Sequence, residues 1–169
     1  IANKPDSQDI CFVSDDDYAS FIEEESNQKI PEGNFVTPDG KILGRHKGII
    51  HYTIGQRKGL GLPSTQPYYI NKICPDTREI VLGDGKSVFS DTVYVENINY
   101  MSVENITEPT RFIGKIRYAH QGSPCIVYPE KEGRLKCVFD EKQRAVTPGQ
   151  AIVFYDGDVI AAGGWITRY

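Results

Sequence analysis

The sequence predicts a mainly β protein with two small consecutive β-rich domains and one short N-terminal helix. Three observations support this fold class. The 169 residues include 16 Gly, 10 Pro and 10 Tyr, a composition typical of short strands and turns. A helical hydrophobic period occurs only before residue 30, and alternating or β-branched runs recur after it. The length is sufficient for the core of one average domain or two small ones.

The first element expected is a helix over about residues 15–25. Ser14 is a suitable N-cap, and the three aspartates that follow it are favourable at the positive end of a helix dipole. Tyr18, Phe21 and Ile22 have the spacing of one apolar stripe on such a helix. The three glutamates at positions 23–25 are expected to face solvent.

The clearest strands form two hairpins in the second half of the chain. Each hairpin is indicated by two apolar runs that flank a short polar turn. The runs expected to pair are residues 125–128 with 135–139, and residues 151–155 with 159–162. Short strands at this spacing are typical of small barrels.

Composition and cysteine spacing limit the class of protein. The 39% hydrophobic and 25% charged residues are typical of a globular chain, and no run of 18 apolar residues could span a bilayer. The chain starts at Ile1 without a leader, so we expect a piece of a longer cytoplasmic protein with no membrane partner. Four cysteines without a C-x-x-C pair predict free thiols and no metal site.

Charge is segregated along the chain. Residues 1–39 hold ten acids and two bases, whereas residues 40–75 hold six bases and no acid. His46 and several other histidines and tyrosines are interleaved with these bases. Cations with interleaved rings favour contact with nucleic acid, through phosphates and stacked bases. The alternative is a solvated face of a small barrel.

The glycine-rich segment at residues 44–61 has the composition of a phosphate-binding loop but not the spacing. It contains neither G-x-x-x-x-G-K-[ST] nor a G-x-G-x-x-G that opens a helix. The segment therefore favours extended nucleic acid over a mononucleotide.

A second basic region is expected on a strand at residues 111–118. Alternation places the three cations on one face and three apolar or aromatic side chains on the other. The cations are Arg111, Lys115 and Arg117, and the opposite face holds Phe112, Ile116 and Tyr118. An RNA-binding face and an edge whose charges prevent aggregation are the two interpretations of this strand.

Cys11 is the best candidate nucleophile among the cysteines. It lies just ahead of the expected helix, where the helix dipole lowers the pKa of a thiol. The alternative is an inert buried cysteine between Ile10 and Phe12. Packing is the expected role of Cys74, Cys125 and Cys137.

Several segments, taken together and in order, resemble the tRNA-specific 2-thiouridylase family. They are residues 6–12, 44–61, 115–118, 145–150 and 163–166. The resemblance implies an enzyme of three parts: an N-terminal nucleotide hydrolase-like domain with a phosphate loop, a small central β domain and a C-terminal β-barrel.

The resemblance also divides this chain into three regions. Residues 1–29 match the end of the catalytic domain, residues 30–90 the central basic β domain, and residues 91–169 the C-terminal β-barrel. From the residues alone, the turn at 83–85 places the main boundary near residues 86–95.

By resemblance, Cys11 matches the cysteine that carries a persulfide and delivers sulfur to C2 of the wobble uridine, after ATP has adenylated the oxygen on that carbon. Arg117 and Tyr118 match a pair that contacts tRNA, and Gln150 matches a further tRNA contact in the barrel. The implied partners are tRNA and a sulfur-donor protein.

The same resemblance implies that ATP, with Mg²⁺, binds to an N-terminal domain whose motifs do not occur in these residues. We therefore expect no cofactor on this chain, and no activity from it alone. The alternative is a stand-alone β-barrel adaptor that binds RNA and in which Cys11 is inert. A catalytic domain encoded upstream of Ile1 would favour the enzyme.

Overall fold

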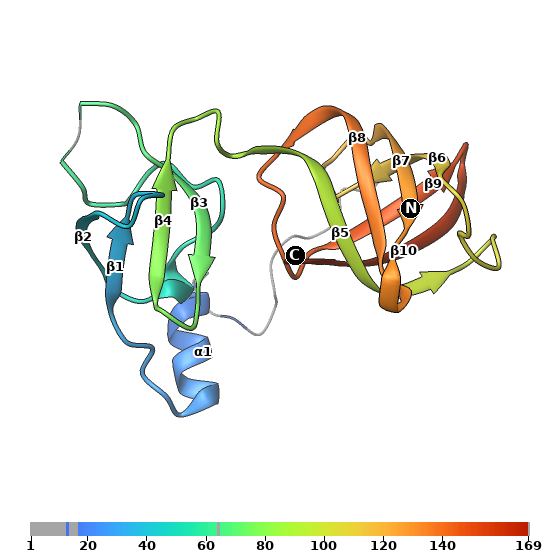
Figure 1. The fold of residues 1–169 in the computed structure, drawn as a ribbon. Helices are drawn as coiled ribbons and strands as arrows, with labels where there is room; N and C mark the ends of the chain where they lie inside the picture. The colour runs from blue at the N-terminus through green and yellow to red at the C-terminus, as the bar shows by residue number, and fades with distance from the viewer. Residues whose placement is uncertain (1–12, 14–16, 64, 169) are drawn as a thin grey trace.

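The computed structural model describes residue 13, residues 17–63 and residues 65–168. These residues form a four-stranded sheet and, beside it, a closed six-stranded barrel (Figure 1). One short α-helix precedes the sheet. The predicted fold class, mainly β with two β-rich parts and a short N-terminal helix, is therefore confirmed.

Helix α1 (Tyr18–Ser26) begins later than expected. Its N-cap is Asp17, whose carboxylate accepts hydrogen bonds from the amide N (3.1 Å) and the hydroxyl (2.6 Å) of Ser20. A carboxylate so close to the first turn satisfies an amide that the helix leaves unpaired. Ser14 lies outside the described residues and is not the N-cap of α1.

Two of the three residues in the apolar stripe expected on α1 are exposed. Tyr18 and Ile22 are 36% and 41% exposed, and Ala19 is the buried residue of the helix. Spacing alone shows only which side chains share a face. It does not show what covers that face.

The four-stranded sheet has the order β2-β1-β4-β3, in which β1 and β4 are parallel and the other pairs antiparallel. Its strands are β1 (Gly33–Val36), β2 (Ile42–His46), β3 (Tyr69–Cys74) and β4 (Glu79–Gly83). A 3₁₀ turn, η2 (Ile49–His51), lies in the long segment between β2 and β3. The sheet and this segment enclose a small core of Phe35, Leu60, Ile70, Ile80 and Leu82.

The barrel closes in the order β10-β5-β8-β7-β6-β9. Its strands are β5 (Phe89–Tyr100), β6 (Thr110–Lys115), β7 (Ser123–Pro129), β8 (Leu135–Arg144), β9 (Ala151–Asp156) and β10 (Val159–Thr167), with the 3₁₀ turn η3 (Lys131–Gly133) before β8. Both expected hairpins are present, because β7 pairs with β8 and β9 with β10. Alternate side chains of these strands fill the interior.

A tight turn connects the two β-rich parts. Strand β4 ends at Gly83 and β5 begins at Phe89. Between them, the carboxylate of Asp84 accepts hydrogen bonds from the backbone N of Lys86 (3.1 Å) and of Ser87 (2.9 Å). These bonds to Ser87 and Lys86 hold the pKa of Asp84 below its usual value. The connection is therefore an ordered turn and not an extended linker.

Hydrogen bonds also join the barrel to the residues that precede it. The backbone N of Ala145 donates to the carbonyl of Val88 (2.8 Å), next to the connecting turn. The guanidinium of Arg144 donates to the carbonyl of Gly55 (3.1 Å), in the segment between β2 and β3. Within the described part of the chain, no helix is long and apolar enough to cross a membrane.

Candidate nucleic-acid interface

The pairing of β6 with β9 brings the predicted RNA contacts together. The two strands are antiparallel, with Lys115 opposite Val153. The turn after β6, which carries Arg117 and Tyr118, therefore lies next to the start of β9. Gln150 immediately precedes β9. Residues more than 30 positions apart in the sequence thus occupy one side of the barrel.

These residues line a groove of about 650 Å³, which we call the barrel groove. Its lining residues are Lys115, Arg117, Tyr118, Ala119, Gln150, Ala151, Val153 and Tyr155. The lining contains two cations and no acid. All three predicted RNA contacts, Arg117, Tyr118 and Gln150, are among them.

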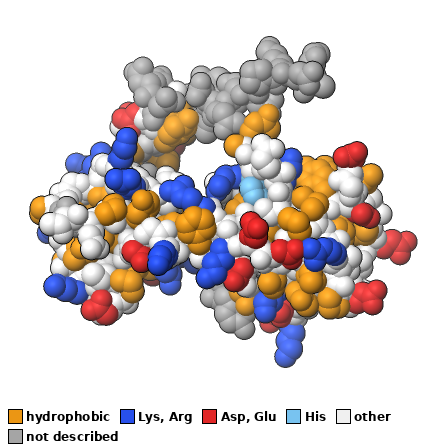
Figure 2. Space-filling view, turned by 90° about the horizontal axis from the view of Figure 1, so that it is seen from above, with side chains coloured by type: hydrophobic (Ala, Val, Ile, Leu, Met, Phe, Trp, Pro, Cys, Tyr) orange, Lys and Arg blue, Asp and Glu red, His pale blue; other side chains and the backbone are white. Residues whose placement is uncertain are grey.

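A second groove of about 470 Å³ lies between the barrel and the segment that follows β2, and we call it the junction groove. Its lining residues are Thr53, Ile54, Gly55, Gln56, Arg117, Arg144, Ala145, Thr147 and Gln150. It also lacks acidic residues and shares Arg117 and Gln150 with the barrel groove. In Figure 2, Lys and Arg side chains border the constriction between the two lobes. The two grooves together form a surface suited to an anionic polymer.

Arg117 is exposed, and a hydrogen bond to a backbone carbonyl orients its side chain. Its Nη1 donates a hydrogen bond to the carbonyl of Arg144 (3.0 Å), whose own side chain bonds Gly55. A guanidinium carries further N–H groups that can bind phosphate. Arg117 is thus held at the point where the barrel groove meets the junction groove.

Tyr118 does not share the buried face of β6 as alternation predicted. Phe112 and Ile116 are 5% and 1% exposed, as expected, but Tyr118 is 67% exposed. The strand ends at Lys115 and the chain turns, with the N of His120 donating to the carbonyl of Arg117 (3.1 Å). The turn breaks the period of two and leaves the Tyr118 ring accessible.

His120 lies in the turn after β6, close to Arg117 and Lys115. Its Nδ1 accepts a hydrogen bond from the N of Ile116 (3.3 Å). Burial, followed by the positive charges of Arg117 and Lys115, lowers the pKa of His120 below its usual value. At neutral pH the positive charge of the barrel groove therefore comes from its Lys and Arg residues.

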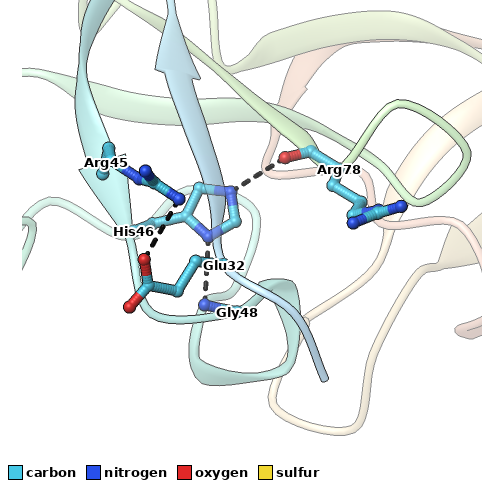
Figure 3. A network of polar contacts seen from close by, with 5 residues as sticks. All are labelled: Glu32, Arg45, His46, Gly48 and Arg78. Carbon is cyan, nitrogen blue, oxygen red and sulfur yellow. Dashed lines mark hydrogen bonds and ion pairs between the residues drawn. The ribbon is translucent and has the colours of Figure 1, made fainter. Parts of the chain in front are cut away.

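The basic stretch at residues 40–75 is only partly available for RNA. Its six Lys and Arg side chains are exposed, although Arg45 forms an ion pair with Glu32 (3.2 Å). His46, however, is 2% exposed, so its ring is not available to stack on a base. Its Nδ1 accepts a hydrogen bond from the N of Gly48 (3.1 Å), and its Nε2 lies 3.1 Å from the carbonyl of Arg78 (Figure 3).

The predicted nucleophile, Cys11, lies outside the described residues. The described cysteines, Cys74, Cys125 and Cys137, form no disulfide. A hydrogen bond with Cys125, followed by burial, raises the pKa of Cys137, so this thiol stays protonated in the barrel core. No group of His, Cys, Asp and Glu within the described ranges could hold a metal ion.

Tyr155 and Arg144 line the grooves but were not among the predicted site residues. Lys115 was expected on a cationic face, shared with Arg117, that supplies phosphate contacts. Alternation within the second hairpin carried a signal for Tyr155, since Ile152 and Phe154 of the same strand point into the barrel. No sequence pattern indicated the non-local pairing of β6 with β9.

The sequence matches two known domain families. Residues 19–84, which include most of α1, match the tRNA methyl transferase PRC-barrel domain, and residues 90–166 match the aminomethyltransferase beta-barrel domain. The matched ranges correspond to the two β-rich parts of the structure.

The chain is also similar to curated proteins named tRNA-specific 2-thiouridylase MnmA. It is 50% identical to that of Lachnoclostridium phytofermentans over 99% of this chain and 47% of the relative. The identity is 48% for the protein of Acetivibrio thermocellus, over 98% of this chain and 46% of the relative. For the protein of Clostridioides difficile, the identity is 46% over 99% of this chain and 46% of the relative. This chain thus spans about half the length of the relatives that it matches.

Proposed function

Because this chain belongs to the tRNA-specific 2-thiouridylase family and corresponds to its C-terminal part, we propose that it supplies a tRNA-binding surface to such an enzyme. The observation that carries this proposal is the pair of acid-free grooves that meet at Arg117 and Gln150. Guanidinium, phenol and amide groups suit phosphate contact, stacking and hydrogen bonding to RNA. Arg117, Tyr118 and Gln150 are the proposed tRNA contacts.

The catalytic contribution that we propose for this chain is Cys11. In the full-length enzyme, adenylation converts the oxygen on C2 of the wobble uridine into part of a good leaving group, AMP. The terminal sulfur of a persulfide on Cys11 is a nucleophile strong enough to attack that carbon, from which AMP leaves with the oxygen. A thiol in the remainder of the enzyme then attacks the S–S bond at Cys11, so that the terminal sulfur stays on C2 and a disulfide forms. We propose that a donor protein loads this sulfur and that the enzyme acts in the cytoplasm.

The start of α1 lacks the features of a phosphate-binding helix N-terminus. Phosphate is commonly bound where a glycine-rich loop opens an α-helix, whereas α1 is preceded by the acidic N-cap Asp17. We therefore assign ATP and its Mg²⁺ to the remainder of the full-length enzyme. On this proposal, the chain alone binds tRNA without modifying it.

The first prediction concerns Arg117. Arg117→Ala should weaken tRNA binding to this chain and reduce the slope of log affinity against log salt by about 1, because one phosphate contact is lost. The measurement is a titration of labelled tRNA between about 50 and 200 mM salt. Arg111→Ala is the matched control, because Arg111 lies on β6, just before the turn that carries Arg117, but is paired with Asp140.

The control should leave the affinity and the slope nearly unchanged. An affinity that does not depend on salt, or equal losses in the two variants, would contradict the proposed RNA surface. Circular dichroism of both variants would confirm that the barrel is intact.

The second prediction concerns Cys11 in the full-length enzyme. Cys11→Ser should abolish formation of 2-thiouridine while tRNA binding and adenylation persist, because serine cannot hold a persulfide. The measurement is a single-turnover thiolation assay, with the adenylated intermediate followed in parallel. Thiolation by Cys11→Ser near the wild-type rate would contradict the proposed catalytic role of Cys11. Cys74→Ser is the matched control and should remain active.

A further inference from the structure

We infer that the barrel groove holds one unpaired nucleotide of the RNA, with its base stacked on Tyr155 and its phosphate bound by Lys115. This inference rests on the proposed function, since it names what part of a bound RNA enters the groove. It adds two residues, Tyr155 and Lys115, to the proposed contacts. It also predicts a preference for single-stranded RNA over duplex RNA.

The register of β9 directs Tyr155 into the groove. Ile152 and Phe154 are fully buried in the barrel, so the alternate residues Ala151, Val153 and Tyr155 face outward. Tyr155 is half-buried and lies opposite Ile113 of β6. Its ring is therefore supported by the sheet and forms one wall of the groove.

Lys115 places a positive charge beside this ring. Its Nζ lies 5.4 Å from the centroid of the Tyr155 ring, within the range of a cation–π interaction. The ring thereby keeps the flexible ammonium close to the groove, where no acid among the lining residues neutralises it. A phosphate bound by Lys115 would hold its own base next to Tyr155.

The rest of the groove suits a base. Ala119, Ala151 and Val153 are small, so they leave room above the sheet, and Gln150 supplies an amide. Amides form paired hydrogen bonds with base edges. The volume of about 650 Å³ lies within the range of small-molecule sites in proteins. The groove thus combines a ring, an amide and cations within the space of one nucleotide.

The aromatic wall distinguishes unpaired from paired RNA. In a duplex, both faces of each base are covered by neighbouring pairs, and a protein ring cannot reach them. A base in a loop or single strand offers a free face, and stacking on an aromatic side chain stabilises it. Cations alone would bind the phosphates of either form.

The test compares three variants of this chain: Tyr155→Ala, Tyr155→Phe and Tyr128→Ala. Tyr128 is the matched control, because it is half-buried on the outside of β7 and lines neither groove. The probes are a labelled oligouridylate of about ten nucleotides and an RNA duplex of the same length. Tyr155→Ala should weaken oligouridylate binding by about 5- to 160-fold, the range measured for loss of one stacked base.

Duplex binding should change little in the same variant. Tyr155→Phe keeps the ring and should retain the affinity for oligouridylate, and Tyr128→Ala should behave like the wild type. Equal losses for single-stranded and duplex RNA, or no loss in Tyr155→Ala, would overturn the stacking site. If Arg117→Ala still weakens tRNA binding in that case, the proposed function survives without the nucleotide site.

Uridine monophosphate serves as a third probe. Free nucleotide should compete with oligouridylate only weakly, because it lacks the neighbouring phosphates that the other cations bind. Binding of uridine monophosphate that is tighter than that of the oligonucleotide would identify a site for free nucleotides and would overturn the assignment to RNA.

Discussion

His46 shows how a single side chain in a basic segment takes a structural role. Gly48 donates its N–H to Nδ1, so Nδ1 carries no proton and Nε2 donates to the carbonyl of Arg78 (Figure 3). The ring also contacts Phe35 edge to face, with centroids 5.3 Å apart. His46 thus connects β2 to the turn before β4 in its neutral form.

This arrangement predicts a pH-dependent stability. Burial lowers the pKa of His46 below its ordinary value of 6.5, more than the bond to Arg78 raises it. The unfolded chain therefore takes up the proton first as the pH falls. The contribution of His46 to stability is complete above the unfolded pKa and declines as the pH falls from there toward the lower folded pKa.

The measurement is the free energy of unfolding in urea at about pH 7.5 and about pH 5.5. The wild type should be less stable at the lower pH, and His46→Gln should show a smaller difference between the two. Part of the difference should remain, because burial also lowers the pKa of His120. If the difference in unfolding free energy between the two pH values were as large in His46→Gln as in the wild type, the role of His46 would be refuted.

At the scale of single elements, the sequence predicted those elements that depend on interactions between residues close together in the chain. The hairpins β7–β8 and β9–β10 were predictable, because alternation and a short polar turn fix both partners. The start of α1 was not, because Ser14 and Asp17 are both good N-caps and the sequence does not rank them. The segment between β2 and β3 was predicted only as basic and glycine-rich, although its Leu60 completes a core.

The sequence predicted individual residues of the candidate site but not that they form one surface. Arg117, Tyr118 and Gln150 came from a family resemblance, and nothing local to them indicates that they meet. Their meeting depends on the antiparallel pairing of β6 with β9, which are separated by two other strands in the sequence. Tyr155 and Arg144 join the site only through this closure of the barrel. Non-local strand pairing is the step that sequence patterns do not specify.

At the scale of the whole molecule, the proposed RNA surface depends on both β-rich parts. Arg117 and Gln150 belong to the barrel, whereas Gly55 and Gln56 on the other side of the junction groove belong to the segment after β2. The bond from Arg144 to Gly55 and the turn held by Asp84 keep the two sides together. RNA that contacts both sides therefore binds more tightly than RNA that contacts one side. Once the RNA is bound to one side, the other side is held close to it at a high effective concentration.

Lengthening the connecting turn should weaken tRNA binding without unfolding either part. We predict that about six Gly and Ser residues inserted after Gly85 lower the affinity for tRNA on the order of tenfold, because a flexible linker reduces the effective concentration of one side near the other. The affinity is measured by titration, and far-UV circular dichroism reports on the fold. The same insertion after Glu132, in the turn between β7 and β8, is the control, because it lengthens a turn inside the barrel and leaves the junction unchanged. An unchanged affinity after the insertion at Gly85 would show that the barrel binds tRNA without the junction groove.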